Sequence, residues 1–292
     1  MLLYQSSLSL RIIEMFHRRF PEERLNILLS YALLENDAYD ILVTHKDKIN
    51  SIILDSGAYS DNTRGVKTDI DAYISYCRNA GHLYDFYFNL DSDFREDHFS
   101  PENLENLRKM ERAGLGSKLV PVIHSLYTGE IDSYIEKGYP IIALGSSYAT
   151  RLDDMKFIFK MFEKHPQVKI HVFGTTAFEN LIEVPAYSVD SSSWAQTGGF
   201  ADVLFWNPAI EGVNKKDSIN YTGRYNPKDK RDNYYLNHPF KKEFGEYIWK
   251  TFNFRHTDMF FPENRQLVNL KYFVDLEEKI TEEHRKRGFP VW

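Results

Sequence analysis

The chain has 292 residues, of which 42% are apolar, and it can bury a large core in one barrel or in two smaller domains. Its formal net charge of −6 argues against a surface coated in positive charge, so any contact with a nucleic acid must come from a local basic patch. The one cysteine, Cys77, excludes an internal disulfide and a zinc site of several cysteines, and its helical context favours a buried structural thiol.

The N-terminal segment does not read as a signal peptide. Glu14, His17, Arg18 and Arg19 interrupt the apolar run soon after Leu10. No stretch of the chain approaches the roughly 20 apolar residues needed to span a bilayer. We therefore expect a cytoplasmic protein with no membrane partner.

Short apolar runs alternate with amphipathic segments from about residue 27 onward. This pattern is typical of parallel strands buried beneath helices. The expected strands are 27–31, 51–54, 86–90, 119–123, 141–144, 169–173 and 187–189. We place an eighth strand within 201–206 and a long closing helix over 266–287. The sequence thus predicts an α/β fold, a (β/α)8 TIM barrel, as a single domain over 1–292.

Helix starts can be read between the strands. Thr68 precedes a helix expected over 69–78, and Thr150 precedes one over 152–164. Ser100 and Pro101 precede a helix over 102–113, with Ser at the capping position and Pro in the first turn.

A basic and aromatic insertion is expected at about 207–250. Lysines and arginines outnumber aspartates over residues 215–242, and tyrosines are interleaved with them. Basic side chains hold phosphates and aromatic faces stack on bases, so Lys228, Lys230 and Arg231 are candidate nucleic-acid contacts. An ordinary solvated loop is the alternative interpretation.

Polar or glycine residues follow the strands directly. They are Asp55, Asp91, His124, Gly145, Gly174 and Asp190. In a barrel of this type the catalytic groups lie where strands run into the following loops. A single aspartate at such a place more often caps a helix or forms a turn. Several carboxylates and an imidazole at one mouth are costly for stability, so the set indicates a catalytic site.

Residues 55–59, Asp-Ser-Gly-Ala-Tyr, suit a flat ligand. Gly57 and Ala58 allow the backbone to approach closely, and Tyr59 offers a ring for stacking. A second block, residues 172–194, carries Asp190. In general, a carboxylate that acts as a nucleophile suits chemistry at a sugar C1′, where an oxocarbenium-like centre is trapped as a covalent ester.

Three blocks in order resemble one known family. Residues 53–59 resemble the Asp-Ser-Gly-Gly-aromatic signature of the tRNA-guanine transglycosylase superfamily, and residues 142–147 are similar to its Ala-Ile-Gly-Gly-Leu turn. Val-Phe-Gly-Thr-Thr at 172–176, with Val-Asp at 189–190, resembles the block that leads to the nucleophilic aspartate. The order and spacing match over roughly residues 50–200, about half of the chain.

The resemblance implies roles for particular residues. Asp190 would be the nucleophile at C1′, and Asp55 the general acid/base for the departing and entering bases. Asp91 would accept hydrogen bonds from a guanine N1–H and amino group, and His124 stands where the family usually has a glutamine that contacts the guanine carbonyl. The residues that would bind the base are Ser56, Gly57, Tyr59, Asp91, His124, Gly145, Ser146 and Ser147.

The chain also departs from the tRNA enzymes. Those enzymes carry a cysteine-rich zinc subdomain after the nucleophile, whereas this chain has no cysteine after Cys77. The shortened form, with Tyr-Ser-Val-Asp-Ser-Ser-Ser-Trp at 187–194, is similar to the phage and bacterial DNA-guanine transglycosylases. This similarity implies a pentosyltransferase of a bacterial or phage-infected cell that replaces guanine, in DNA in preference to tRNA, with a 7-deazaguanine such as preQ0. It implies no cofactor and no metal.

Three alternatives stay open at this point. The chain could be a tRNA-guanine transglycosylase that lacks the zinc subdomain. It could be a non-catalytic base-binding accessory subunit, although retention of both Asp55 and Asp190 speaks against this. It could also be a barrel that binds a sugar or nucleoside and uses its aspartates only to cap loops.

Overall fold

The computed structural model describes residues 1–34, 38–58, 67–94, 100–124, 129–145, 152–222 and 233–292. The chain divides into two compact units, which are described separately. The first comprises Met1–Ser6, Arg24–Ser191 and Ile280–Trp292, and the second comprises Ser7–Glu23 and Ser192–Lys279. The expected insertion at about 207–250 falls within the second unit.

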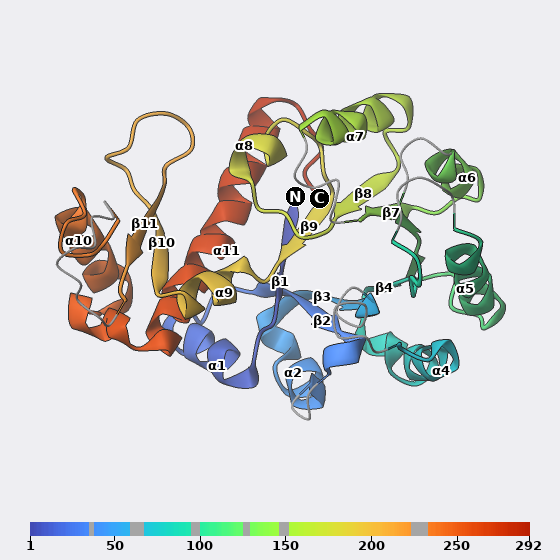
Figure 1. The fold of residues 1–292 in the computed structure, drawn as a ribbon, viewed down its shortest axis with the longest axis horizontal. Coiled ribbons are helices and arrows are strands. Elements are labelled where there is room, and N and C mark those ends of the chain that lie inside the picture. The colour runs from blue at the N-terminus through green and yellow to red at the C-terminus, as the bar shows by residue number, and fades with distance from the viewer. Residues whose placement is uncertain (35–37, 59–66, 95–99, 125–128, 146–151, 223–232) are drawn as a thin grey trace. The chain divides into compact units, whose positions relative to one another are not determined.

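The first unit is a barrel of parallel strands (Figure 1). Its strands are β1 (Leu2–Ser6), β2 (Leu25–Ser30), β3 (Ile49–Asp55), β4 (Phe86–Phe88), β5 (Leu119–Val120), β6 (Val122–Ile123), β7 (Ile141–Leu144), β8 (Lys169–Val172) and β9 (Ser188–Ser191). β5 and β6 are the two halves of one strand position, because Pro121 lacks the N–H that a continuous ladder requires.

The barrel closes across Pro121. β5 pairs with β4, and β6 pairs with β7. The Pro121 carbonyl itself accepts a hydrogen bond from the Ala143 N–H at 2.9 Å. Since β9 pairs with β1, the nine strands within the described residues occupy eight positions around the ring. The predicted α/β barrel is therefore confirmed.

The eighth barrel position is held by β1 and not by the segment at 201–206, so that part of the prediction is wrong. β1 lies between β2 and β9 in the sheet. The other segment forms β10 (Asp202–Trp206), which pairs antiparallel with β11 (Lys216–Asn220) in a separate two-stranded sheet. Both segments are short apolar runs, and only the choice of pairing partner distinguishes them.

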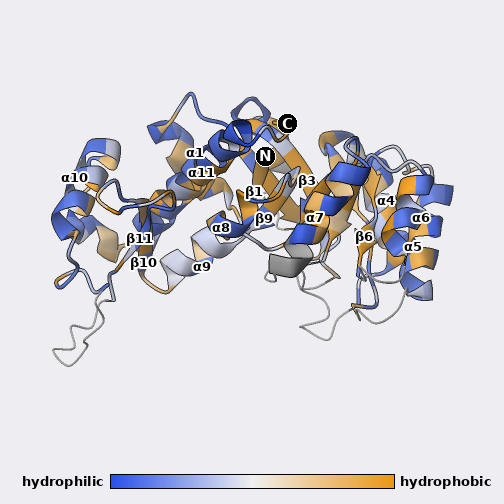
Figure 2. Ribbon diagram, turned by 90° about the horizontal axis from the view of Figure 1, so that it is seen from above, coloured by the Kyte–Doolittle hydropathy of each residue, from blue (hydrophilic) through white to orange (hydrophobic). Residues whose placement is uncertain are grey.

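Alternate residues of the strands fill the barrel interior. Tyr4, Leu28, Ile53, Phe88 and Ala143 belong to one buried cluster. Residues two apart on a strand point to the same face, so the next inward position along each strand lies at the carboxyl end of the barrel. In Figure 2 the strands at the centre of this unit are mostly orange, as expected for strands covered on both faces.

Helices follow the strands and cover the barrel. They are α2 (Ala38–Thr44), α4 (Ile70–Ala80), α5 (Pro101–Arg112), α6 (Glu130–Glu136), α7 (Leu152–Lys164) and α8 (Phe178–Leu181), with 3₁₀ turns η1 (Tyr31–Leu33), η2 (Lys46–Lys48) and η3 (Gly81–Leu83). The Ser100 side chain caps α5 as expected. α4 is capped by the Asp69 carboxylate, which accepts from two backbone N–H groups, and not by Thr68.

The second unit contains α1 (Leu10–Arg19), the β10–β11 pair, α9 (Ser193–Gly199), α10 (Lys241–Phe252), η5 (His256–Phe260) and most of α11 (Pro262–Lys286). Phe205 and Phe244 pack 5.0 Å apart at its centre. Asn269 of α11 accepts from the Leu204 N–H and donates to the Asp202 carbonyl, which ties β10 to the helix. α11 begins at Pro262, before the expected start at 266.

Two further findings bear on the sequence predictions. None of the helices in the described parts of the chain is both long and apolar enough to cross a membrane. The candidate phosphate contacts Lys228, Lys230 and Arg231 lie outside the described residues.

Candidate active site

The carboxyl ends of the parallel strands place four of the predicted residues at one mouth of the barrel. Asp55 is the last residue of β3, two positions after the core residue Ile53, and Asp190 lies in β9 two positions after Ser188. His124 and Gly145 directly follow β6 and β7. Strand alternation therefore directs residues from well-separated parts of the sequence toward the same end.

A tight turn fixes the Asp55 carboxylate. The Gly57 N–H donates to Asp55 Oδ2 at 3.0 Å. Gly57 has a φ of +82°, and a Cβ added there would lie 2.3 Å from the Ala32 Cβ. Only glycine fits this close approach. Ser56, another predicted site residue, is buried beside it.

Asp55 is electrostatically coupled to the other acids of the mouth. Its pKa is raised to about 7, first by burial, then by the charge of Asp190 and to a lesser degree by that of Asp91, while hydrogen bonds from the backbone at Gly57 and Ser56 oppose the rise. A carboxyl whose pKa lies near neutrality can both donate and accept a proton at physiological pH.

The Asp190 carboxylate is anchored through one oxygen. Asp190 Oδ1 accepts a hydrogen bond from the Gly174 N–H at 2.9 Å, and His171 Nε2 lies 3.6 Å from the same oxygen. Gly174 has a φ of +67°, which directs its N–H toward the strand end. No hydrogen bond from the described residues reaches Oδ2. One oxygen of this largely buried side chain is thus left for a ligand.

Asp91 and His124 form a buried pair. His124 Nε2 lies 3.3 Å from Asp91 Oδ2, and the Asn89 amide donates to Asp91 Oδ1 at 3.1 Å. Burial lowers the pKa of His124, but the charges of Asp91 and Glu130 outweigh that effect, so its pKa is raised overall. The Glu130 carboxylate also accepts a hydrogen bond from the His124 backbone N–H at 3.0 Å.

Asn103 determines the tautomer of the neutral His124 ring. Its Oδ1 accepts from the backbone N–H groups of Ser92 and Asp93 at 2.7 and 3.0 Å, which identifies the other amide atom as the nitrogen. That nitrogen lies 3.4 Å from His124 Nδ1, so Nδ1 accepts and Nε2–H donates to Asp91. Both ring nitrogens therefore face protein groups, and His124 orients Asp91.

The remaining predicted residues contribute less to this geometry. The Gly145 N–H donates to the Ile123 carbonyl at 3.1 Å, so this backbone group of a predicted base-binding residue is already used within the sheet. Tyr59, Ser146 and Ser147 lie outside the described residues.

The sequence reading missed His171, Glu130 and Asn103. His171 lies in β8, Lys-Ile-His-Val, where it takes an inward position in an otherwise apolar pattern, and it has no exposed surface. A histidine at an inward-facing position of an apolar strand is the sequence pattern that could have identified it. Glu130 and Asn103 lie in helices, and only the fold brings them to the mouth.

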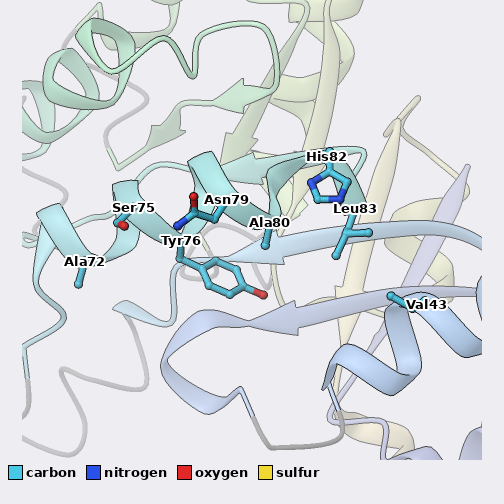
Figure 3. Close-up of a pocket in the computed structure, with 8 residues that line it drawn as sticks. All are labelled: Val43, Ala72, Ser75, Tyr76, Asn79, Ala80, His82 and Leu83. Carbon is cyan, nitrogen blue, oxygen red and sulfur yellow. The ribbon is translucent and has the colours of Figure 1, made fainter.

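A surface pocket of the first unit lies away from these residues. It is lined by Val43, Ala72, Ser75, Tyr76, Asn79, Ala80, His82 and Leu83, between α2 and α4 (Figure 3). None of these side chains comes from a strand end, so the pocket is not part of the mouth. Among the described residues, no three or more His, Cys, Asp and Glu side chains are grouped so that they could hold a metal ion.

Comparison with known proteins found no matching family model and no matching curated protein. The function therefore has to be inferred from the residues and geometry of the barrel mouth.

Proposed function

We propose that the chain is a guanine transglycosylase that exchanges a guanine in nucleic acid for a 7-deazaguanine. The observation that carries the proposal is the pair of unlike carboxylates at one mouth. Asp190 is anchored through Oδ1 by a backbone N–H, whereas the pKa of Asp55 is raised to about 7. Carboxyl groups that differ in this way suit a nucleophile and a general acid/base, respectively.

In the first step the Asp190 carboxylate attacks the sugar C1′. The C1′–N9 bond breaks, its electron pair leaves with guanine, and Asp55 supplies the proton that the departing base needs. In the second step the incoming base gives its N9 proton to Asp55 and attacks C1′. The ester bond breaks and its electron pair returns to Asp190, so the enzyme is restored and no oxidant or reductant is required.

Asp91 is the residue that we propose recognises the base. Its two oxygens are already oriented by Asn89 and His124, so the carboxylate is rigid before a ligand arrives. A rigid acceptor suits the adjacent N–H and amino donors of a guanine-type edge. A base that lacks these donors would leave the buried Asp91 oxygens unpaired, so the site would discriminate strongly against such a base.

DNA is the proposed polymer, with tRNA as the second candidate. The base must leave its stack to reach residues at the end of a barrel. The chain lacks the cysteines from which the tRNA enzymes build their zinc subdomain, since its one cysteine is Cys77. This absence favours a substrate other than tRNA.

The test is incorporation of labelled guanine and labelled preQ0 into DNA and into tRNA by the purified full chain. Incorporation into DNA supports the whole proposal. Incorporation into tRNA alone would mean that the substrate polymer is tRNA and not DNA. Denaturing gels should show a covalent protein–polymer adduct for the wild type and none for Asp190→Asn. Asp71→Asn, at an exposed acid in α4, is the matched control and should retain the adduct. Absence of both incorporation and adduct would favour a non-catalytic base-binding barrel.

A further inference from the structure

A line of three polar side chains runs along the inside of the barrel beneath the mouth. Ser188 Oγ lies 2.8 Å from His171 Nδ1, and His171 Nε2 lies 3.6 Å from Asp190 Oδ1. β8 and β9 are neighbours in the sheet, and His171 is in register with Ser188. The line therefore connects a serine in the core to the candidate nucleophile.

Aromatic rings hold the imidazole in place. The Phe88 ring lies 4.8 Å from the His171 ring, and the Phe173 ring lies 4.7 Å away at 80°. His171 has no exposed surface, so water does not satisfy its nitrogens. Its Nε2 makes no hydrogen bond within the part of the chain that the structure describes. Asp190 Oδ1 lies 3.6 Å from this nitrogen.

Electrostatics determines which nitrogen carries the proton. A bare Nε2 would direct its lone pair at a carboxylate, which is repulsive in a buried position. A proton on Nε2 makes the same contact attractive, and Nδ1 then accepts from the Ser188 hydroxyl. The 3.6 Å separation is longer than a hydrogen bond, and a movement of less than about 1 Å would bring it into that range.

We propose that His171 is a positioning residue for Asp190: it directs Nε2–H at Oδ1, so that Oδ2 is the oxygen that forms the glycosyl ester. The inference rests on the proposed function and deepens it. Gly174 and His171 would then hold Oδ1 from two directions. In the second step, when the C1′–Oδ2 bond breaks and the electron pair returns to Asp190, both N–H groups stabilise the departing carboxylate.

The first test measures breakdown of the covalent adduct. The adduct is isolated and excess labelled base is added, which gives the rate of the second step alone. His171→Phe keeps an aromatic ring between Phe88 and Phe173 but removes the donor, and we expect breakdown to slow by about 10- to 100-fold, the typical effect of one hydrogen bond to a charged group. His171→Gln restores an N–H near the same place and should recover most of the rate. Breakdown at the wild-type rate in His171→Phe would overturn the proposal.

Two matched variants separate positioning from packing. Ser188→Ala removes the hydroxyl that donates to Nδ1 and supports this tautomer, and it should slow breakdown in the same direction but less. Phe88→Leu disturbs the rings around His171 without touching its nitrogens, and it should leave the breakdown rate within about twofold of wild type while lowering stability. Slow breakdown in Phe88→Leu equal to that in His171→Phe would mean that only packing is involved, and would contradict the proposal.

The second test needs no activity. Nitrogen-15 NMR of histidine-labelled protein, with His171 assigned by its loss in His171→Phe, reports which ring nitrogen is protonated. We expect a protonated Nε2 in the wild type and a changed spectrum in Asp190→Asn. A bare Nε2 would refute the hydrogen-bond assignment whatever the activity. Failure of the wild type to form any adduct would instead refute the proposed function, so the two failures are distinguishable.

Discussion

Replacing Asp55 by asparagine should stabilise the folded protein at alkaline pH. The pKa of Asp55 is raised from 3.8 to about 7, chiefly by burial and by the charge of Asp190, so the folded chain binds this proton more tightly than the unfolded chain does. The stability that the folded chain gains from binding this proton more tightly is therefore fully present below about pH 4, and it is lost as the pH rises through about 7. Asparagine resembles the protonated carboxyl in shape and keeps an oxygen for the Gly57 N–H.

The rise in pKa from 3.8 to about 7 corresponds to about 4 kcal/mol, at about 1.4 kcal/mol for each tenfold change in proton affinity. Although Asp55 is largely surrounded by protein, it keeps some contact with water at the mouth, and this screening reduces the expected gain to about 2 kcal/mol. Urea unfolding of wild type and Asp55→Asn, at pH 4 and pH 8, gives the free energies of unfolding to compare. We expect similar stabilities at pH 4 and a more stable variant at pH 8.

The control is Asp71→Asn, which changes an exposed acid in the first turn of α4 and relieves no buried charge. Its stability relative to wild type should change little between the two pH values. If Asp55→Asn were no more stable than wild type at pH 8, the raised pKa of Asp55 would be refuted, and with it the reason for assigning the acid/base role to Asp55.

Three further predictions concern the scaffold of the mouth. Gly57→Ala should lower the free energy of unfolding by about 3 kcal/mol, because a Cβ there would meet Ala32 at 2.3 Å, whereas Gly114→Ala, at the same φ of +82° in open space, should cost only about 1 kcal/mol. Equal losses in urea unfolding would show that the close approach is unimportant. Ser100→Ala removes the side-chain cap of α5 and should lower the free energy of unfolding by about 1 kcal/mol. An unchanged free energy of unfolding would show that the capping hydrogen bond contributes no stability. Burial raises the pKa of the Cys77 thiol to about 12, so iodoacetamide at pH 8 should label the unfolded protein and spare the folded one, and rapid labelling of folded protein would contradict this burial.

The sequence alone determined the features that depend on neighbours along the chain. Apolar runs bounded by polar residues identified most barrel strands, because a strand buried on both faces needs apolar residues throughout. The polar residue after each run, such as Asp55 or Asp190, could be assigned to the mouth, since parallel strands all end at the same side. The helix cap at Ser100 could likewise be predicted from the residues next to it in the sequence.

Only the tertiary structure decided the features that depend on pairing between distant segments. β1 and β10 are both short apolar runs, and the hydrogen-bond ladder alone shows that β1 completes the barrel while β10 joins a separate sheet. Burial and charge at the mouth likewise arise only when strands meet, as in the effect of Asp190 on the pKa of Asp55. The contact between His171 and Asp190 has the same origin, because it is formed across two strands whose register no single segment determines.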